Sequence, residues 1–185
     1  MPLPLLLGIS AAAVLANTYY RKELAEQDAL RRQHLNPRNL IGRYPCDDYP
    51  SDFHVTAEIG NVVCCGVYNG FIHTGIVIDH NAILELHGSG LARAVSYKRF
   101  LANRSGANIF VASDALGHPL NTKLEVNRVS SELFAYHKYH ISKLNCYSHT
   151  WYCITGKWLP FASFEIFNQA LSKKFGQSIY WDRMK

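Results

Sequence analysis

Turn sequences divide the centre of the chain into short, mostly apolar stretches. Asn69-Gly70 is the dipeptide that two-residue type I′ hairpin turns prefer, and Asp79-His80-Asn81 and Gly88-Ser89-Gly90 are further turn sequences. The strand candidates are 61–68, 71–78, 82–87, 91–95 and 108–112. Short connections of this kind join neighbouring antiparallel strands. The pattern therefore predicts a small antiparallel sheet.

Helices are expected around this sheet. The segment 96–101 begins with serine, a good N-cap residue. Thr122 and Glu125 have the spacing of a capping box, ahead of an apolar period that continues to Tyr136. A further helix is expected at 163–175. Together with the strands, these segments predict an α+β fold in which a small sheet packs against helices.

A short helix is predicted from Cys146 to Thr155. Asn145 is a good N-cap and Gly156 a good residue for the left-handed position after the last turn. Cys146 then lies in the first turn, where the partial positive charge of the helix end stabilises a thiolate. The sequence therefore indicates Cys146 as a candidate nucleophile.

A base for this cysteine can be sought by strand register. If 79–81 is a three-residue loop, His73 lies opposite His87 and Gly75 lies opposite Glu85, with all four positions on one face of the sheet. Gly75 would then leave open space beside His73. A slip of one residue would turn Glu85 and His87 away together. In this register His73 is the candidate general base, and Glu85 or His87 would orient it.

Four short motifs, taken in order, resemble the lecithin:retinol acyltransferase-like domain, a circularly permuted branch of the papain-like, NlpC-type superfamily. The motifs are Glu58-Ile59-Gly60-Asn61-Val62-Val63, His73-Thr74-Gly75-Ile76-Val77-Ile78, the segment from Tyr139 to Asn145-Cys146, and Trp151-Tyr152-Cys153-Ile154-Thr155-Gly156-Lys157. The resemblance covers about residues 55–158. It implies a permuted papain-like core with the catalytic cysteine at a helix N-terminus.

The resemblance also implies residue roles. Cys146 matches the nucleophile of the family's Asn-Cys motif, and His73 matches the histidine that acts as base. Glu85 occupies the third catalytic position, where many members have histidine, and His87 follows two residues later. The chain departs from the family at 147–149, where Tyr-Ser-His replaces the usual Glu-His-Phe, and at Asn61, where aspartate is common.

The implied chemistry is cysteine-dependent acyl transfer or hydrolysis on a lipid or lipid-linked acyl substrate through a thioester. Peptide or amide hydrolysis of the NlpC type is an alternative, and no cofactor is expected. Two other classes compete with it. Cys146, His149 and Cys153 share one helical face and could bind zinc with His73 or His87. The chain could also be a catalytically inactive, membrane-tethered binding module.

An apolar run near the N-terminus indicates attachment to a membrane. The apolar run 3–16 precedes Tyr19-Tyr20-Arg21-Lys22, so 1–22 is predicted to be an N-terminal anchor with the domain on the cytoplasmic side. A signal peptide that is cleaved before export, or a helix packed on the protein, are alternatives. A polar helix and a Pro-rich linker are expected at 23–48, the catalytic domain at 49–158, and a basic and aromatic extension at 159–185.

Charge and cysteine usage limit the partners. The net charge is +5, and the excess lies toward the C-terminal end, which fits an anionic membrane surface or a solvated face. We find no nucleic-acid motif and expect no nucleic-acid partner; the oligomeric state has no signal in the sequence. The five cysteines lack the spacing of a disulfide-rich module, which favours a reducing compartment. Adjacent Cys64 and Cys65 are expected to be buried on opposite faces of a strand.

Overall fold

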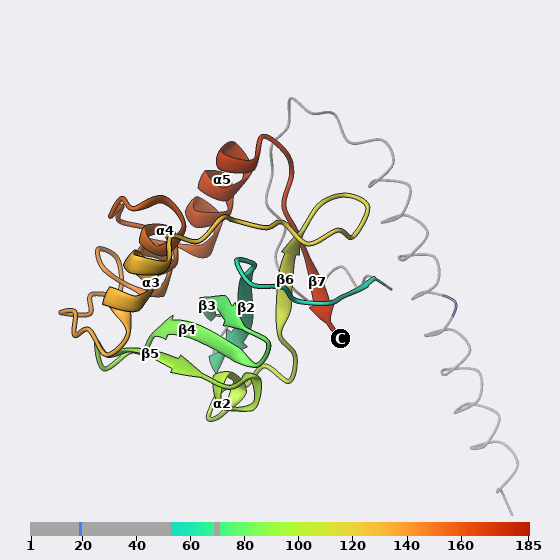
Figure 1. Cartoon of the computed structure of the whole chain (residues 1–185). Coiled ribbons are helices and arrows are strands. Elements are labelled where there is room, and N and C mark those ends of the chain that lie inside the picture. Colours follow the sequence, from blue (N-terminus) through green and yellow to red (C-terminus); the bar gives the residue numbers. More distant parts are fainter. Residues whose placement is uncertain (1–18, 20–52, 69–70) are drawn as a thin grey trace, which may run out of the picture.

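A computed structural model describes residue 19 and residues 53–68 and 71–185 (Figure 1). This part of the chain is α+β, with a seven-stranded mixed sheet and four helices. In chain order the elements are β1 (His54–Val55), β2 (Val62–Val67), β3 (Phe71–Asp79), β4 (Ala82–Leu86), β5 (Ala92–Val95), α2 (Tyr97–Leu101), β6 (Phe110–Ser113), α3 (Val126–Glu132), α4 (Cys146–Thr155), α5 (Phe164–Phe175) and β7 (Tyr180–Met184).

The sheet is larger than the sequence predicts, and it is not purely antiparallel. Its strand order is β1-β7-β6-β2-β3-β4-β5, and β1 pairs with β7 in parallel. The predicted hairpins supply β2 to β5. Strand β7, which the sequence analysis missed, adds to β6 on the other side, and its buried Asp182 accepts a hydrogen bond from Ser113 Oγ. A charged residue inside a strand hides the usual apolar signal, which explains why β7 was missed.

Away from the turn, β3 and β4 pair in the predicted register. Ile76 pairs with Leu84, as the three-residue loop requires. At the turn the prediction is wrong, because Asp79 rather than Ile78 pairs with Ala82. An irregularity between residues 77 and 79 absorbs the one-residue difference, so the pairs Ile76–Leu84 and Val77–Ile83, next to the site residues, keep the predicted register.

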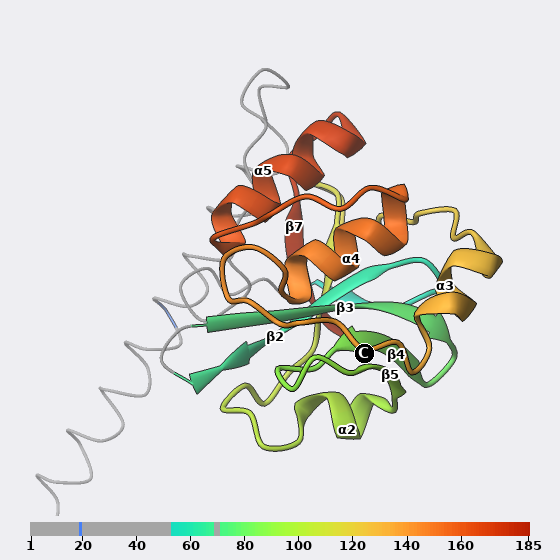
Figure 2. The same cartoon turned by 90° about the vertical axis from the view of Figure 1, so that its left-hand side faces the viewer.

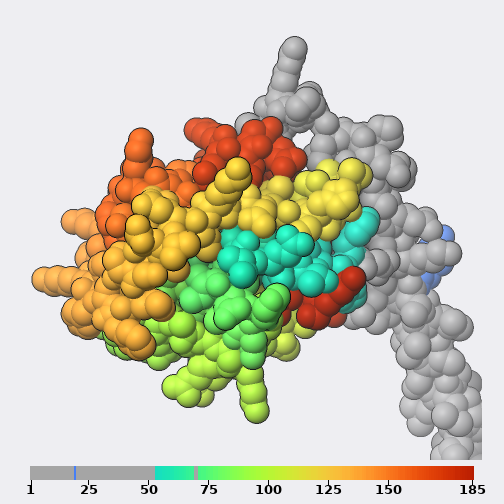
Figure 3. All heavy atoms as spheres, viewed as in Figure 1, coloured from blue at the N-terminus to red at the C-terminus, as the bar shows by residue number. Residues whose placement is uncertain are grey.

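Helices cover both faces of the sheet. In Figure 2, α4 and α5 lie above β2 and β3 and α2 lies below them. Cys64 belongs to the apolar cluster beneath α4 and α5, whereas Cys65 belongs to the cluster with Phe100 of α2, and both thiols are fully buried. This confirms the expectation for the cysteine pair. In Figure 3 the chain around α2 (green) forms the lower surface and α5 (red) the upper one.

The predicted ends of α4 and α2 are confirmed, but the cap of α3 is not. The Asn145 side chain accepts from Ser148 N at 3.1 Å, and Ser96 caps α2. Thr122 does not form a capping box, since its Oγ1 donates instead to Gly60 O at 2.6 Å. Helix α3 ends at Glu132, so the apolar period to Tyr136 continues beyond the helix.

Residues 159–185, expected as an extension, belong to the same core and sheet. Helix α5 begins after Ser163, as predicted, and buries Phe164, Phe167 and Leu171. These side chains share one apolar cluster with Cys146, so the C-terminal segment supports the helix that carries the cysteine.

The predicted anchor at 1–22 and the polar helix and linker at 23–48 fall outside the described residues, apart from Tyr19. Among the residues that the structure does describe, no helix has the length and apolar character needed to cross a membrane.

Candidate active site

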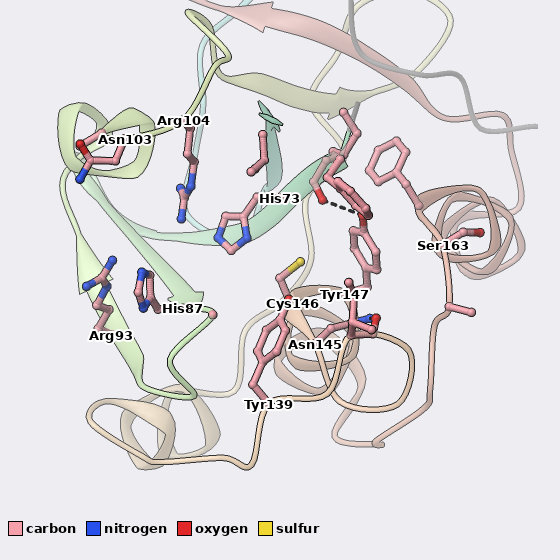
Figure 4. A pocket seen from close by; sticks show the side chains of 18 of the residues that line it. His73, His87, Arg93, Asn103, Arg104, Tyr139, Asn145, Cys146, Tyr147 and Ser163 are labelled. Atoms are coloured by element: carbon pink, nitrogen blue, oxygen red, sulfur yellow. Dashed lines mark hydrogen bonds between the residues drawn. The ribbon is translucent and has the colours of Figure 1, made fainter. Parts of the chain in front are cut away.

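Three of the predicted site residues meet at one place. Cys146 is the first residue of α4, His73 lies on β3 and Glu85 on β4. The His73 Nε2 atom is 2.8 Å from Glu85 Oε2. The other ring nitrogen of His73, Nδ1, is therefore left to act toward Cys146, which lies next to the imidazole in Figure 4. The arrangement has the order thiol, imidazole, carboxylate that an activated cysteine requires.

Glu85 is held ionised in the interior. Its carboxylate is fully buried, and two guanidinium groups share it with His73: Arg104 contacts Oε2 at 2.7 Å and Arg93 contacts Oε1 at 2.9 Å. Burial alone would raise the pKa of Glu85. The hydrogen bond and charge of His73 and the charge of Arg104 outweigh burial and lower this pKa to about 2. A carboxylate that stays charged can orient the imidazole and stabilise its protonated form.

The cysteine and the histidine shift each other's protonation. Burial opposes charge on both groups, but the imidazole charge and its hydrogen bond lower the pKa of the Cys146 thiol, with help from Thr74. In turn, the thiolate of Cys146 and the hydrogen bond to Glu85 raise the pKa of His73 above its ordinary value despite burial. The pair therefore favours thiolate and imidazolium, the reactive state of a nucleophilic cysteine.

Gly75 does not leave open space beside His73, contrary to the prediction. A Cβ at this position would lie 2.5 Å from Ile83 Cγ2 and 3.2 Å from the Phe100 ring. The missing side chain lets these two apolar residues close over the strand. The Phe100 ring lies 5.3 Å from the imidazole of His73, so packing fixes the base from this side.

His87 lies near the site but makes a different contact. Its Nδ1 bonds to Ser89 Oγ at 2.8 Å, and its side chain lines the cavity described below. The structure thus places Glu85 against His73 and puts His87 on the wall. The zinc arrangement weighed from the sequence is not formed, because Cys146 turns to His73 whereas His149 Nε2 turns to Glu132 at 3.1 Å.

A cavity of about 700 Å³ opens in front of Cys146. Its apolar lining comes from Val67, Phe71, Ile72, Ile141, Ala162 and Phe164, and its basic and polar lining includes His87, Arg93, Arg99, Asn103 and Arg104. Figure 4 shows Arg93, Arg104 and His87 on one side of Cys146 and Tyr147 on the other. Among the described residues that line the cavity none is acidic. The volume and the two kinds of wall suit a ligand with an apolar chain and an anionic group.

Arg93, Arg104 and Tyr139 also belong to the site, although none of them is a site residue predicted from the sequence. Arg93 pairs directly with Glu85 across β4 and β5, so the Gly88-Ser89-Gly90 turn could have indicated it. Arg104 follows α2 and has no local signal. Tyr139 lies beside Cys146, and burial together with the cysteine's negative charge raises its pKa to about 12. Its hydroxyl is therefore protonated at neutral pH and available as a donor.

Comparison with known proteins identifies no relative of this chain. No protein-family model, no curated protein and no solved structure matches this chain. The resemblance noted in the sequence therefore stays a prediction, and the geometry around Cys146 carries the functional argument.

Proposed function

We propose that this protein is a cysteine-dependent acyltransferase or hydrolase that takes an acyl group from a lipid or lipid-linked ester through a thioester on Cys146. The observation that carries the proposal is the contact chain from Cys146 through His73 to the buried Glu85, with Cys146 and His73 lining a partly apolar cavity. Membership of the lecithin:retinol acyltransferase-like family, with its permuted papain-like core, is part of this proposal.

The side chains of the site can supply and accept every proton that the proposed reaction needs. The Cys146 thiolate attacks the ester carbonyl carbon, and the ester C–O bond breaks while protonated His73 gives its proton to the leaving alcohol. An acceptor, which is water in hydrolysis or an alcohol or amine in transfer, then attacks the thioester carbonyl. His73 takes the acceptor's proton and Cys146 leaves as thiolate, which restores the starting state. Glu85 holds the imidazole in one orientation throughout.

The cavity indicates which part of a substrate lies where. The apolar side, with Phe71, Ile72 and Phe164, suits an acyl chain. On the other side Arg93, Arg99 and Arg104 line the cavity, and only Arg93 and Arg104 pair with the carboxylate of Glu85, which leaves positive charge for a phosphate or carboxylate of the substrate. We therefore favour an acyl ester with an anionic group over a neutral peptide.

Hydrolysis of p-nitrophenyl esters by the full chain tests this function. We expect turnover with butyryl and longer acyl chains that Cys146→Ser abolishes, and no cleavage of a p-nitroanilide peptide. Serine retains the size of the side chain, but its hydroxyl is not deprotonated by this histidine at neutral pH. Equal ester turnover by the wild type and Cys146→Ser would contradict the proposal, and cleavage of the peptide alone would favour the amide-hydrolase alternative.

Tyr139 is the donor that we assign to the oxyanion formed when the thiolate attacks. Tyr139→Phe removes only the hydroxyl beside Cys146, and we expect kcat to fall by about 10²-fold, the loss typical of one oxyanion donor. The thermal midpoint should change little, because the ring remains. Tyr136→Phe is the matched control, since Tyr136 is exposed. Unchanged kcat in Tyr139→Phe would remove this tyrosine from the mechanism.

A further inference from the structure

A second cluster of chemically reactive side chains lies beyond the catalytic site, between α3, the loop after it and α4. Glu132 ends α3, His137 lies in the loop, and His149 faces them from α4. Glu132 Oε2 is 2.7 Å from His137 Nε2 and 3.1 Å from His149 Nε2. One ligand atom from each residue lies within 4.8 Å of the other two. Three possible metal ligands therefore converge on one point.

Cys153 supplies a fourth group. It lies one helical turn after His149, and its Sγ is 3.9 Å from His149 Nε2. Both side chains are fully buried, and Glu132 is 8% exposed at its side chain. The Trp158 ring, 5.1 Å from His137 and 6.2 Å from His149, covers the cluster. The group is thus enclosed, and the partly exposed His137 gives access to it.

Apolar packing does not account for this set. A single carboxylate oxygen serves both imidazoles, and His149 Nδ1 is buried without a hydrogen-bond partner in the described part of the chain. The His149 ring therefore makes its polar contacts only inside the cluster. Two imidazoles, a carboxylate and a thiol gathered in one buried site are costly to desolvate, and a bound ion that all four contact would offset this cost.

We propose that Glu132, His137, His149 and Cys153 bind one zinc ion. Zinc prefers tetrahedral sites with nitrogen, sulfur and oxygen ligands, and bonds of about 2.0–2.3 Å put neighbouring ligand atoms roughly 3.3–3.7 Å apart. Glu132 Oε2 lies 2.7 and 3.1 Å from the two imidazole nitrogens, close to this range. Cys153 Sγ lies 3.9 Å from His149 Nε2 but outside the group of three whose ligand atoms are all within 4.8 Å of one another, so its side chain must turn toward them to complete the site. Binding transfers the Cys153 thiol proton to solvent and forms the Zn–S bond.

Four protein ligands leave no open position, so the ion is structural. It ties the end of α3 and the 137 loop to the middle of α4, the helix whose first residue is Cys146. The inference does not depend on the proposed acyl chemistry, and it uses none of the residues that carry that chemistry.

Zinc content of the full chain, purified without chelator from zinc-supplemented medium, tests the proposal. We expect about one zinc per wild-type chain and less than about a tenth in His137→Asn, since loss of one ligand of four removes most of the affinity. His118→Asn is the matched control, because His118 also contacts a carboxylate but lies exposed at the surface. Cys146→Ala should retain zinc, which separates this site from the catalytic thiol.

Replacing zinc with cobalt makes it possible to detect a bound thiolate by absorption spectroscopy in the wild-type protein. Wild-type protein loaded with Co²⁺ should show a thiolate-to-cobalt charge-transfer band that Cys153→Ser lacks and Cys146→Ala retains. Wild-type chain without zinc and without this band would overturn the proposal. So would zinc that is retained in His137→Asn, or zinc that is lost in Cys146→Ala.

Discussion

Replacing His73 with glutamine is expected to lower ester turnover by about 10²- to 10⁴-fold and to leave Cys146 unreactive at mildly acidic pH. In the wild type the imidazole lowers the thiol pKa, and the thiolate raises the pKa of His73. The reactive pair therefore exists between these two values. Thiolate forms as pH rises through the lowered pKa of Cys146, and imidazolium is lost only above the raised pKa of His73.

The pH profile of Cys146 alkylation by iodoacetamide measures this. At about pH 6.5 the wild-type thiol should react faster than a free cysteine, whose pKa is about 8.5. In His73→Gln the charge and hydrogen bond of the imidazole are lost and only the contacts of Thr74 still oppose burial, so the rate should drop and the profile should move to higher pH. His118→Gln serves as control, since His118 is exposed and belongs to a separate ion pair. Identical profiles in His73→Gln and the wild type would exclude His73 as the base.

Glu85→Gln is expected to reduce both stability and activity. The carboxylate is fully buried and binds His73, Arg93 and Arg104, so its loss leaves two guanidinium groups without their partner. Breaking a buried ion pair from one side costs about 3–5 kcal/mol of unfolding free energy. The pKa of Glu85 falls from 4.5 to about 2, and a depression of this size corresponds to about 3 kcal/mol.

The sign of the pH dependence follows from this depressed pKa. The stability contributed by Glu85 is present above its unfolded value of 4.5 and is lost as pH falls toward about 2. Urea unfolding of the wild type should therefore show a steep loss below about pH 4.5 that Glu85→Gln largely lacks. Glu125→Gln, at an exposed pair with Arg128, should cost less than about 1 kcal/mol. Equal stability of Glu85→Gln and Glu125→Gln at neutral pH would contradict the buried network.

The same substitution decides the third catalytic position. Glu85→Gln should lose more turnover than His87→Asn, because Glu85 contacts His73 whereas His87 contacts Ser89. The reverse order would assign the role to His87.

The helix that begins at Cys146 could be predicted because its signals lie next to it in the sequence. The complete sheet and the partners of the site residues could not, because they depend on pairing between distant parts of the chain. Asn145 and Gly156 lie next to α4 in sequence, so its two ends could be predicted without any knowledge of the fold. The register of one hairpin predicted His73, Glu85 and His87 on one face of the sheet, but it left open which of the last two contacts His73; in the structure it is Glu85. In contrast, β7 joins β6 from the far end of the chain, and no spacing rule reaches across that distance.

The proposed zinc ligands also could be predicted only in part from the sequence. The helical spacing correctly places His149 and Cys153 on one face of α4. It could not identify their partners, because Glu132 and His137 come from α3 and a loop whose path depends on tertiary packing. Sequence spacing therefore grouped His149 with Cys146, which the fold separates.

Trapping of the acyl-enzyme tests the central claim most directly. The full chain is mixed briefly with p-nitrophenyl butyrate, quenched in acid and digested. The masses of the peptides are then measured by mass spectrometry. We predict a butyryl adduct on the peptide that contains Cys146, which neutral hydroxylamine removes as expected for a thioester, and its absence from Cys146→Ser. Turnover of the ester by the wild type with no adduct on Cys146, or with an adduct only on another residue, would contradict the account.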